Sequence, residues 1–207
     1  RFVERAAKEL RQWQELLAVI GPAVSIWGSA RIQPDHPYYK ATVELAAYLT
    51  RRGFFIITGA GPGIMEAANR GAREATKKSG TSIGLRIELF FEQGINPFVN
   101  VPLTFKYFFA RKMGFVNLSQ AFIAMPGGMG TMDEFFEILA LKDRGYIGDL
   151  PIILYDRQFY AGLRHILKDM ARQGMFRRPL KDLIAFADTK EEVYHHIKKS
   201  MAAERKN

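Results

Sequence analysis

The sequence predicts a single α/β domain of the Rossmann-like type, a doubly wound parallel sheet with helices on both faces. Short apolar runs alternate along the chain with segments whose apolar residues recur at helical spacing. Each run is continuously apolar, which is typical of strands buried on both faces of a parallel sheet. Two strand-to-helix junctions are rich in glycine. We therefore expect a ligand site beyond the carboxyl ends of the strands.

The predicted fold begins with an amphipathic helix within residues 1–20. Apolar residues from Leu10 to Ile20 recur at helical spacing, and Gly21-Pro22 ends the segment. The run Ala23 to Gly28 (AVSIWG) predicts the first strand. The remaining predicted elements are a helix from Tyr38 to Arg52, a strand from Phe54 to Thr58, a helix from Gly63 to about Lys78, a strand from Ser82 to Leu85, a loop with Pro97 and Pro102, a helix from about Lys106 to Leu118, a strand from Ala121 to Met125, a helix from Thr131 to about Arg144, a strand from Pro151 to Tyr155, a helix from about Phe159 to Arg172, a strand near Ile184 and a helix within residues 189–203.

Length and composition exclude several classes of protein. The chain has 207 residues, which suits one domain, and its 48% hydrophobic and 25% charged residues exclude a disordered, collagen-like or coiled-coil chain. It contains no cysteine, so it has no disulfide framework, no thiolate metal site and no cysteine nucleophile. A reducing compartment is permitted, and we expect a cytoplasmic location. The uncharged stretch from Met113 to Met132 is broken by polar residues and glycines, so we expect no membrane span.

The chain is basic, with a formal net charge of +9. This charge favours a polyanion or a phosphorylated small molecule as a partner. However, the basic residues occur mostly in pairs, and no run is long enough for a nucleic-acid tail. The excess is greatest after Arg164. We interpret it as a solvated face and expect no specific nucleic-acid partner.

The two glycine-rich junctions are Thr58 to Gly63 (TGAGPG) and Pro126 to Thr131 (PGGMGT). Glycine lets the backbone approach a ligand closely, and the first amides of the following helix favour phosphate. Either junction alone could be a tight turn. Two of them in one small sheet favour a phosphate or nucleotide site, so we expect residues 23–186 to form a nucleotide-binding core.

Other phosphate and catalytic motifs are absent from the sequence. The G-x-G-x-x-G fingerprint, the Walker A motif and the G-x-S-x-G elbow do not occur. The four histidines lack metal-ligand spacing. We therefore predict no catalytic metal and no bound cofactor.

Arg111 and Lys112 are the only charged residues between Tyr107 and Met132. Aromatic residues occupy the neighbouring helical positions of Arg111. A guanidinium buried among them needs a carboxylate or a ligand phosphate as its partner. The alternative is a surface pair whose apolar stems are covered while the charges reach solvent.

Thr131 and Glu134 have the spacing of a capping box, in which Thr131 caps a helix and Glu134 bonds back to it. The same carboxylate, in the first turn of a helix beside a phosphate loop, can also face a bound sugar and stabilise positive charge there. The two roles are compatible.

The motif Pro126-Gly127-Gly128-Met129-Gly130-Thr131-Met132-Asp133-Glu134, with Arg111-Lys112 upstream, resembles the hallmark of the Lonely Guy (LOG) family. The likeness includes Gly28-Ser29-Ala30-Arg31, the stretch from Gly59 to Asn69 and residues 88–96, and it covers most of the chain from Ala23 to Phe186. The leading helix is similar to that of the longer, second type of member. Ala60 departs from the pattern, since relatives commonly carry a third glycine there.

The resemblance implies a phosphoribohydrolase, which cleaves the N-glycosidic bond of a nucleoside 5′-monophosphate to give free base and ribose 5-phosphate. In some members the base is a cytokinin. It also implies a homodimer or a higher homo-oligomer with sites near the interface. The catalytic residues expected on this basis are Arg111 and Glu134. The expected substrate-binding residues are Gly28, Ser29, Gly59, Gly61, Gly63, Glu88, Lys112, Pro126, Gly127, Gly128, Met129, Gly130 and Thr131.

Two alternatives remain open from the sequence. The same loops could serve a non-catalytic nucleotide-binding or regulatory protein. Nonspecific nucleic-acid binding rests on charge alone, and the sequence lacks the aromatics interleaved with basic residues that such proteins use.

Overall fold

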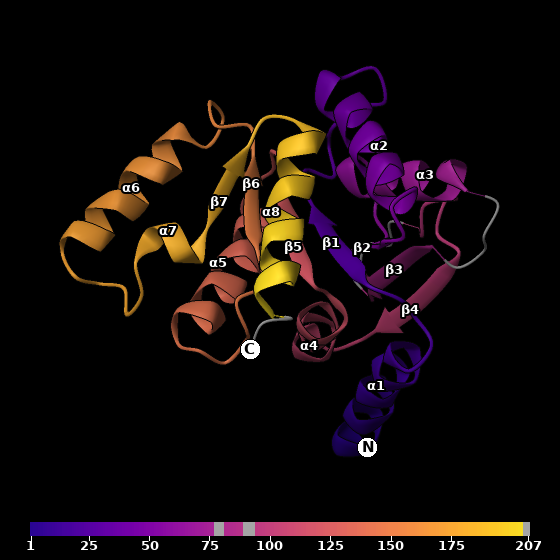
Figure 1. Ribbon diagram of the computed structural model, residues 1–207. Helices are drawn as coiled ribbons and strands as arrows, with labels where there is room; N and C mark the ends of the chain where they lie inside the picture. Colours follow the sequence, from indigo (N-terminus) through magenta and orange to yellow (C-terminus); the bar gives the residue numbers. More distant parts are fainter. Residues whose placement is uncertain (77–80, 89–93, 205–207) are drawn as a thin grey trace.

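The computed structural model, which describes residues 1–76, 81–88 and 94–204, confirms the predicted fold class (Figure 1). Seven parallel strands form one sheet in the order β4-β3-β2-β1-β5-β6-β7. The strands are β1 (Ala23–Trp27), β2 (Phe55–Thr58), β3 (Ser82–Ile87), β4 (Val101–Phe105), β5 (Ala121–Ala124), β6 (Ile152–Tyr155) and β7 (Ala185–Ala187). The helices are α1 (Phe2–Leu17), α2 (Pro37–Thr50), α3 (Ile64–Ala75), α4 (Phe108–Leu118), α5 (Met129–Asp143), α6 (Ala161–Arg172), α7 (Leu180–Leu183) and α8 (Lys190–Glu204).

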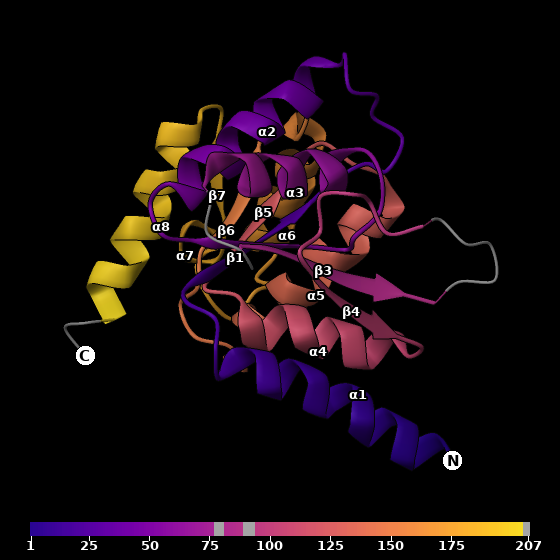
Figure 2. The same cartoon turned by 90° about the vertical axis from the view of Figure 1, so that its right-hand side faces the viewer.

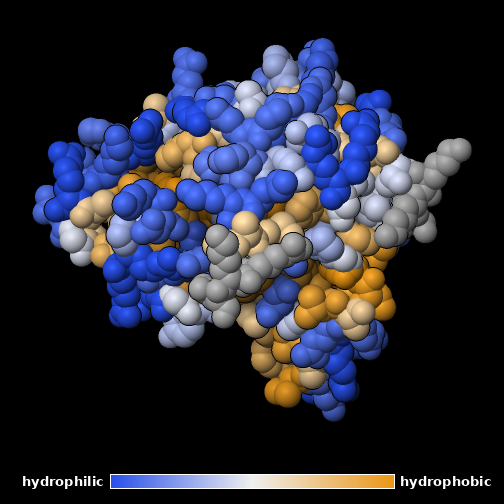
Figure 3. Space-filling view, in the orientation of Figure 1, coloured by the Kyte–Doolittle hydropathy of each residue, from blue (hydrophilic) through white to orange (hydrophobic). Residues whose placement is uncertain are grey.

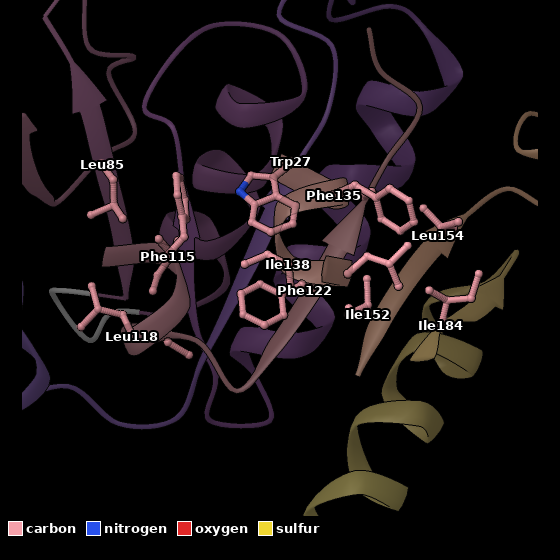
Figure 4. Packing of buried hydrophobic residues seen from close by; sticks show 14 of the residues in the cluster. Trp27, Leu85, Phe115, Leu118, Phe122, Phe135, Ile138, Ile152, Leu154 and Ile184 are labelled. Atoms are coloured by element: carbon pink, nitrogen blue, oxygen red, sulfur yellow. The ribbon is translucent and has the colours of Figure 1, made fainter. Parts of the chain in front are cut away.

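The helices cover both faces of the sheet (Figure 2). Successive residues of a strand point to opposite faces, so Val24 and Ile26 of β1 join one core cluster, with α2, α3 and α8. Trp27 joins the other, with α1, α4 and α5. In that second cluster the Trp27 ring stacks on Phe122 at 5.5 Å and meets Phe115 edge-on at 5.6 Å (Figure 4). The core thus fixes the end of β1, from which the first loop departs.

The order of the strands creates a crevice at the middle of the sheet. Strand β1 pairs with β2 on one side and with β5 on the other. Because the connections from these neighbouring strands leave in opposite directions, a gap opens beyond the carboxyl ends of β1 and β5. The loops that follow Trp27 and Ala124 therefore face one another across it.

Strand β4 was not predicted, since residues 97–102 read as a loop because of Pro97 and Pro102. The structure corrects this expectation: Val101–Phe105 pairs with β3 at the edge of the sheet. An edge strand has one side without a ladder, so a proline can occupy it without breaking the sheet. The four-residue helix α7 was also missed, because one turn is too short to show a helical period.

Most predicted boundaries shift by one to three residues. Helix α1 ends at Leu17 rather than at Gly21-Pro22. The predicted end of the third helix near Lys78 lies outside the described residues, as does most of the likeness over residues 88–96. No helix within the described parts of the chain is long and apolar enough to cross a membrane.

Candidate active site

A cleft of about 640 Å³ lies beyond the carboxyl ends of β1 and β5. The loop after β1 forms one wall, the start of α5 forms another, and side chains from α3 and α4 close it. Its lining residues are Trp27, Gly28, Ser29, Ala30, Arg31, Met65, Phe108, Arg111, Gly128, Met129, Gly130, Thr131, Asp133 and Glu134. The structure thus brings both predicted catalytic residues into one cleft with six of the predicted binding residues.

The backbone of Ser29 joins the two glycine-rich junctions. Its amide donates to the carbonyl oxygen of Pro126 at 3.1 Å, and its carbonyl oxygen accepts from the amide of Ile64 at 3.0 Å. A Cβ on Gly28 would collide with the Ile64 side chain, and one on Gly63 would collide with the Ser29 carbonyl oxygen. Gly63 also has a φ of +68°, which favours glycine. These close approaches hold the three loops together as one frame.

The start of α5 differs from the predicted capping box. The helix begins at Met129, two residues earlier than expected, and its N-cap is Gly128, which makes no side-chain cap hydrogen bond. Thr131 therefore lies inside the first turn, where its side chain packs so closely on Gly127 that a Cβ there would collide with it. The extended backbone of Gly128 lets the helix begin directly after the strand. The first amides of a helix have no acceptor within it, and the residues that carry them here, Met129 to Thr131, line the cleft.

Arg111 is held among apolar neighbours, as its sequence context indicated. Its side chain is 12% exposed, its Nε donates to the carbonyl oxygen of Leu85 at 2.9 Å, and its Cζ lies 5.3 Å from the centre of the Phe115 ring. A Cβ on Gly59 would come within 2.5 Å of the guanidinium. Burial lowers the pKa of Arg111, and the Glu134 carboxylate opposes that shift. The alternative interpretation, in which Arg111 lies on the surface with its charge in solvent, is therefore wrong.

Glu134 is buried in the wall of the cleft, with 7% of its surface exposed. Its Oε1 lies 3.9 Å from Nη1 of Arg111, close enough for electrostatic attraction but too far for a hydrogen bond. Burial raises the pKa of Glu134, whereas Arg111 and Lys112 act to lower it. The carboxylate is thus oriented by a cation and still has oxygens free to meet a ligand or a water molecule.

The structure does not bring Lys112 and Glu88 into the cleft. Lys112 Nζ pairs with Asp133 at 2.9 Å and Glu137 at 2.8 Å, so it ties α4 to α5. Glu88 accepts from Arg5 of α1 at 2.6 Å. Lys112 is thus engaged by carboxylates of α5, and Glu88 by an arginine of α1. Neither residue lines the cleft.

The junction from Gly59 to Gly63 supports the cleft from behind. Asn69, which is buried, accepts from Thr58 Oγ1 at 2.6 Å and from Asn96 Nδ2 at 2.9 Å. Asn96 Nδ2 also donates to the Gly61 carbonyl oxygen at 3.0 Å. Ala60 adopts a φ of +65°, in the left-handed region, which glycine adopts more readily than alanine. Gly59 borders Arg111, whereas Gly61 and Gly63 do not line the cleft.

Six lining residues were missed by reasoning from the sequence: Trp27, Ala30, Arg31, Met65, Phe108 and Asp133. Arg31 is exposed and lies two residues after Ser29, in the loop that follows β1. Its positive charge beside that loop was the one signal by which the sequence could have identified it as a binding residue. The indole Nε1 of Trp27 is buried without a hydrogen-bond partner among the described residues. Nothing in the sequence distinguished this tryptophan from a core residue. Within the same described part of the chain, no cluster of three or more His, Asp or Glu side chains is arranged to hold a metal ion.

The parallel sheet and its central crevice define a Rossmann-like α/β protein whose cleft contains a largely buried arginine and a buried glutamate. More particularly, the chain belongs to the LOG family, described as "Possible lysine decarboxylase", whose profile matches residues 65–197. This agrees with the resemblance found in the sequence motifs.

Two relatives illustrate the similarity. The chain is 27% identical over 191 residues to the pyrimidine/purine nucleotide 5′-monophosphate nucleosidase of Escherichia coli (strain K12), with 89% of this chain and 42% of that protein covered. It is 27% identical over 167 residues to a probable cytokinin riboside 5′-monophosphate phosphoribohydrolase of Oryza sativa subsp. japonica, with 77% and 65% covered. The chain therefore spans less than half the length of the bacterial relative.

Among solved structures, the molybdenum cofactor carrier protein of Chlamydomonas reinhardtii superimposes with a TM-score of 0.63 at 21% identity, covering 87% of this chain and 98% of that one. At this identity the likeness supports the fold alone.

Proposed function

We propose that this protein hydrolyses the N-glycosidic bond of a nucleoside 5′-monophosphate, giving free base and ribose 5-phosphate. The observation that carries the proposal is the buried pair of Arg111 and Glu134 beside the first turn of α5. The names of the relatives agree with it, since one is a nucleotide 5′-monophosphate nucleosidase and another a probable phosphoribohydrolase of cytokinin ribotides. Cytokinin ribotides and ordinary nucleotides are both candidate substrates.

The 5′-phosphate is proposed to bind at the start of α5. The amides of Met129, Gly130 and Thr131 are the first of the helix, and they line the cleft. Free amides and the positive end of the helix dipole favour a phosphate group at this position. Arg31, exposed at the rim, adds a cation that can reach the same oxygens.

Glu134 is proposed to act at the anomeric carbon. Cleavage of an N-glycosidic bond develops positive charge on the ribose, and a nearby carboxylate stabilises it, as carboxylates do in other glycosidases. The same carboxylate can take a proton from the attacking water. The C–N bonding electrons then leave with the base, which gains a proton. Because Glu134 is desolvated, its interaction with the developing charge is stronger than it would be in water.

Arg111 is proposed to position the substrate and to hold Glu134 in the ionised form. Its Nε is fixed by the Leu85 carbonyl oxygen, so its two terminal nitrogens point from a rigid anchor. A group held in this way reduces the entropy that is lost when reacting atoms are aligned.

The family's description as possible lysine decarboxylases suggests a different reaction, but the cleft favours glycoside hydrolysis. Decarboxylation of an amino acid with pyridoxal phosphate needs a lysine that forms a Schiff base. The residues that line the cleft include no lysine, and Lys112 is engaged by Asp133 and Glu137.

A homodimer or larger assembly is also proposed, built on the apolar surface of α4 and α5 next to the cleft. Phe108, Phe109, Met113, Met129 and Phe136 are all exposed large apolar residues of these two helices. Exposed apolar patches of this kind mark interfaces. Light scattering should show at least a dimer, and Phe109→Glu combined with Phe136→Glu should shift it to monomer. A cytoplasmic location is proposed as well, because the sequence has no cysteine and so permits a reducing compartment.

The activity is tested by incubating the protein with a panel of nucleoside 5′-monophosphates and separating free base by chromatography. We expect base release from at least one nucleotide, loss of release in Glu134→Gln, and normal release in the control Glu15→Gln, whose side chain is exposed on α1. Release of no base from any nucleotide would reject the proposal. Tight binding by calorimetry without turnover would instead favour a nucleotide-binding or regulatory protein.

A further inference from the structure

A second hollow, of about 900 Å³, lies between α6, α7, β7 and α8. It shares no lining residue with the cleft of Arg111 and Glu134. Figure 3 shows it beside α6 as an apolar floor framed by hydrophilic side chains. Its lining residues are Arg157, Arg164, His165, Lys168, Ala171, Arg172, Leu180, Lys181, Ile184, Ala185, Phe186, His196 and Lys199.

The lining of this groove contains arginine, lysine and histidine but no carboxylate. Two of its arginines are already neutralised nearby: Arg157 pairs with Asp188 and Glu192, and Arg172 pairs with Asp169. The others differ. The remaining arginine and lysine residues of the groove lining form no ion pair with any described residue. They are Arg164, Lys168, Lys181 and Lys199.

These four cations come from three different helices, α6, α7 and α8, which converge on the same hollow. Bringing like charges together costs electrostatic energy, which an anionic ligand would offset. The basic excess near the end of the chain, which the sequence analysis interpreted as a solvated face, is therefore concentrated in part around a concave site.

The floor of the groove is apolar and open. Leu167 is the one residue of α6 that is buried. The helix therefore packs only loosely against the edge of the sheet. Leu180, Ile184 and Phe186 form the floor, and the Arg164 guanidinium lies 5.4 Å from the centre of the Phe186 ring. A flat ring is suited to such a surface, where it meets apolar side chains below and a guanidinium at its side.

We propose that this groove binds a nucleoside triphosphate, with its ring on the Phe186 floor and its phosphates between the cations of α6 and α8. The volume is within the range of small-molecule sites. The three to four negative charges of a triphosphate match the four free cations. This proposal does not rest on the catalytic function of the cleft, because the two sites have no residue in common.

Other occupants fit less well. A second copy of this chain would place one basic groove against another in a symmetric contact, and like charges would repel. A single-stranded nucleic acid needs several large aromatic platforms along a track, whereas the lining of this groove has one phenyl ring, that of Phe186, and no tyrosine or tryptophan.

Binding is tested by calorimetry with ATP as the probe, at a salt concentration near 0.15 M, where nonspecific surface attraction is screened. We expect saturable binding that Lys168→Glu with Lys199→Glu weakens by about tenfold or more. Lys40→Glu, a charge reversal at an exposed position of α2 outside the groove, should leave ATP binding unchanged. Gly127→Ala, which should weaken phosphate binding in the cleft, should leave ATP binding in the groove unchanged as well, and this separates the two sites.

Three results would overturn the proposal. The first is equal ATP affinity in the wild-type protein and in the double variant, with Lys168→Ala and Lys199→Ala as the milder pair if charge reversal prevents folding. The second is binding of inorganic triphosphate as tightly as ATP, since the apolar floor would then contribute nothing. The third is tighter binding of an oligothymidylate or of polyglutamate than of ATP, which would assign the groove to a macromolecule.

Discussion

Nη1 of Arg111 and Oε1 of Glu134 lie 3.9 Å apart across the wall of the cleft, with their side chains 12% and 9% exposed and not hydrogen-bonded to each other. Burial disfavours the charged form of each side chain, and the attraction between the two opposite charges offsets part of that cost. The gap between them is nevertheless wide enough for a substrate atom to interact with both. This spacing connects the fold to the proposed chemistry and leads to specific expectations.

Glu134→Gln keeps the shape of the side chain and removes its charge. If the carboxylate stabilises positive charge on the ribose, kcat should fall by about 10²- to 10³-fold while KM changes little. Steady-state release of base measures both constants. A fall confined to KM would contradict the assigned role and indicate a binding residue instead.

The acid side of the pH profile should report Glu134. Burial raises its pKa above the ordinary value of 4.5, and the proposed mechanism needs the ionised form. Activity should therefore be lost on acidification at a higher pH than for an exposed carboxyl group. We expect kcat/KM, measured from about pH 4 to pH 8, to show a limb with a midpoint above 4.5. A midpoint at or below that value would be inconsistent with a desolvated catalytic carboxylate.

Arg111→Lys and Arg111→Ala should separate charge from geometry. Lysine supplies the charge but cannot both bond to the Leu85 carbonyl oxygen and present a planar fork to the substrate. We expect Arg111→Ala to lower kcat/KM by roughly 10²-fold and Arg111→Lys to recover part of that loss. Equal activity in Arg111→Lys and wild type would show that only charge matters. The exposed Arg51 at the C-cap of α2, changed to Ala, is the matched control.

Gly127→Ala should disturb phosphate binding specifically. The new Cβ would collide with the Thr131 side chain and displace the first turn of α5. The KM for a nucleoside monophosphate should rise roughly tenfold, equivalent to about 1.4 kcal/mol. Cleavage of the nucleoside without phosphate, however slow, should be unaffected. If both substrates were affected equally, the first turn of α5 would not be the phosphate site.

Lys142 provides a test of stability away from the cleft. Burial lowers its pKa from 10.5 to about 8, although its Nζ donates to the Leu183 carbonyl oxygen at 3.0 Å. Between these two pH values the unfolded chain holds more protons than the folded protein, so stability rises with pH. Relative to Lys142→Met, the wild type should gain up to about 3 kcal/mol of unfolding free energy over this interval. Urea titrations at several pH values measure the difference, and a constant difference would contradict the prediction.

The local chemistry of the site was predictable because it is encoded in short patterns. The glycine-rich junctions, the helices that follow them and the isolation of Arg111 among aromatics are all visible within a few residues of one another. The strand β4 was hidden because proline is usually a breaker, and only its place at the sheet edge makes it compatible with a strand. The predicted capping box at Thr131 was wrong because the helix starts at Met129, two residues earlier, with Gly128 as its N-cap.

The sequence by itself determined the alternation of strands and helices and the loops that can hold a phosphate. It also singled out Arg111 and Glu134 as the proposed catalytic residues. The tertiary structure alone decided that Ser29 joins both glycine-rich junctions, that Lys112 and Glu88 are engaged elsewhere, and that cations from three helices surround one groove. The physical reason is that strand order and helix packing set which side chains meet. Those contacts are between segments distant in the chain, and their energies depend on burial that no local pattern records.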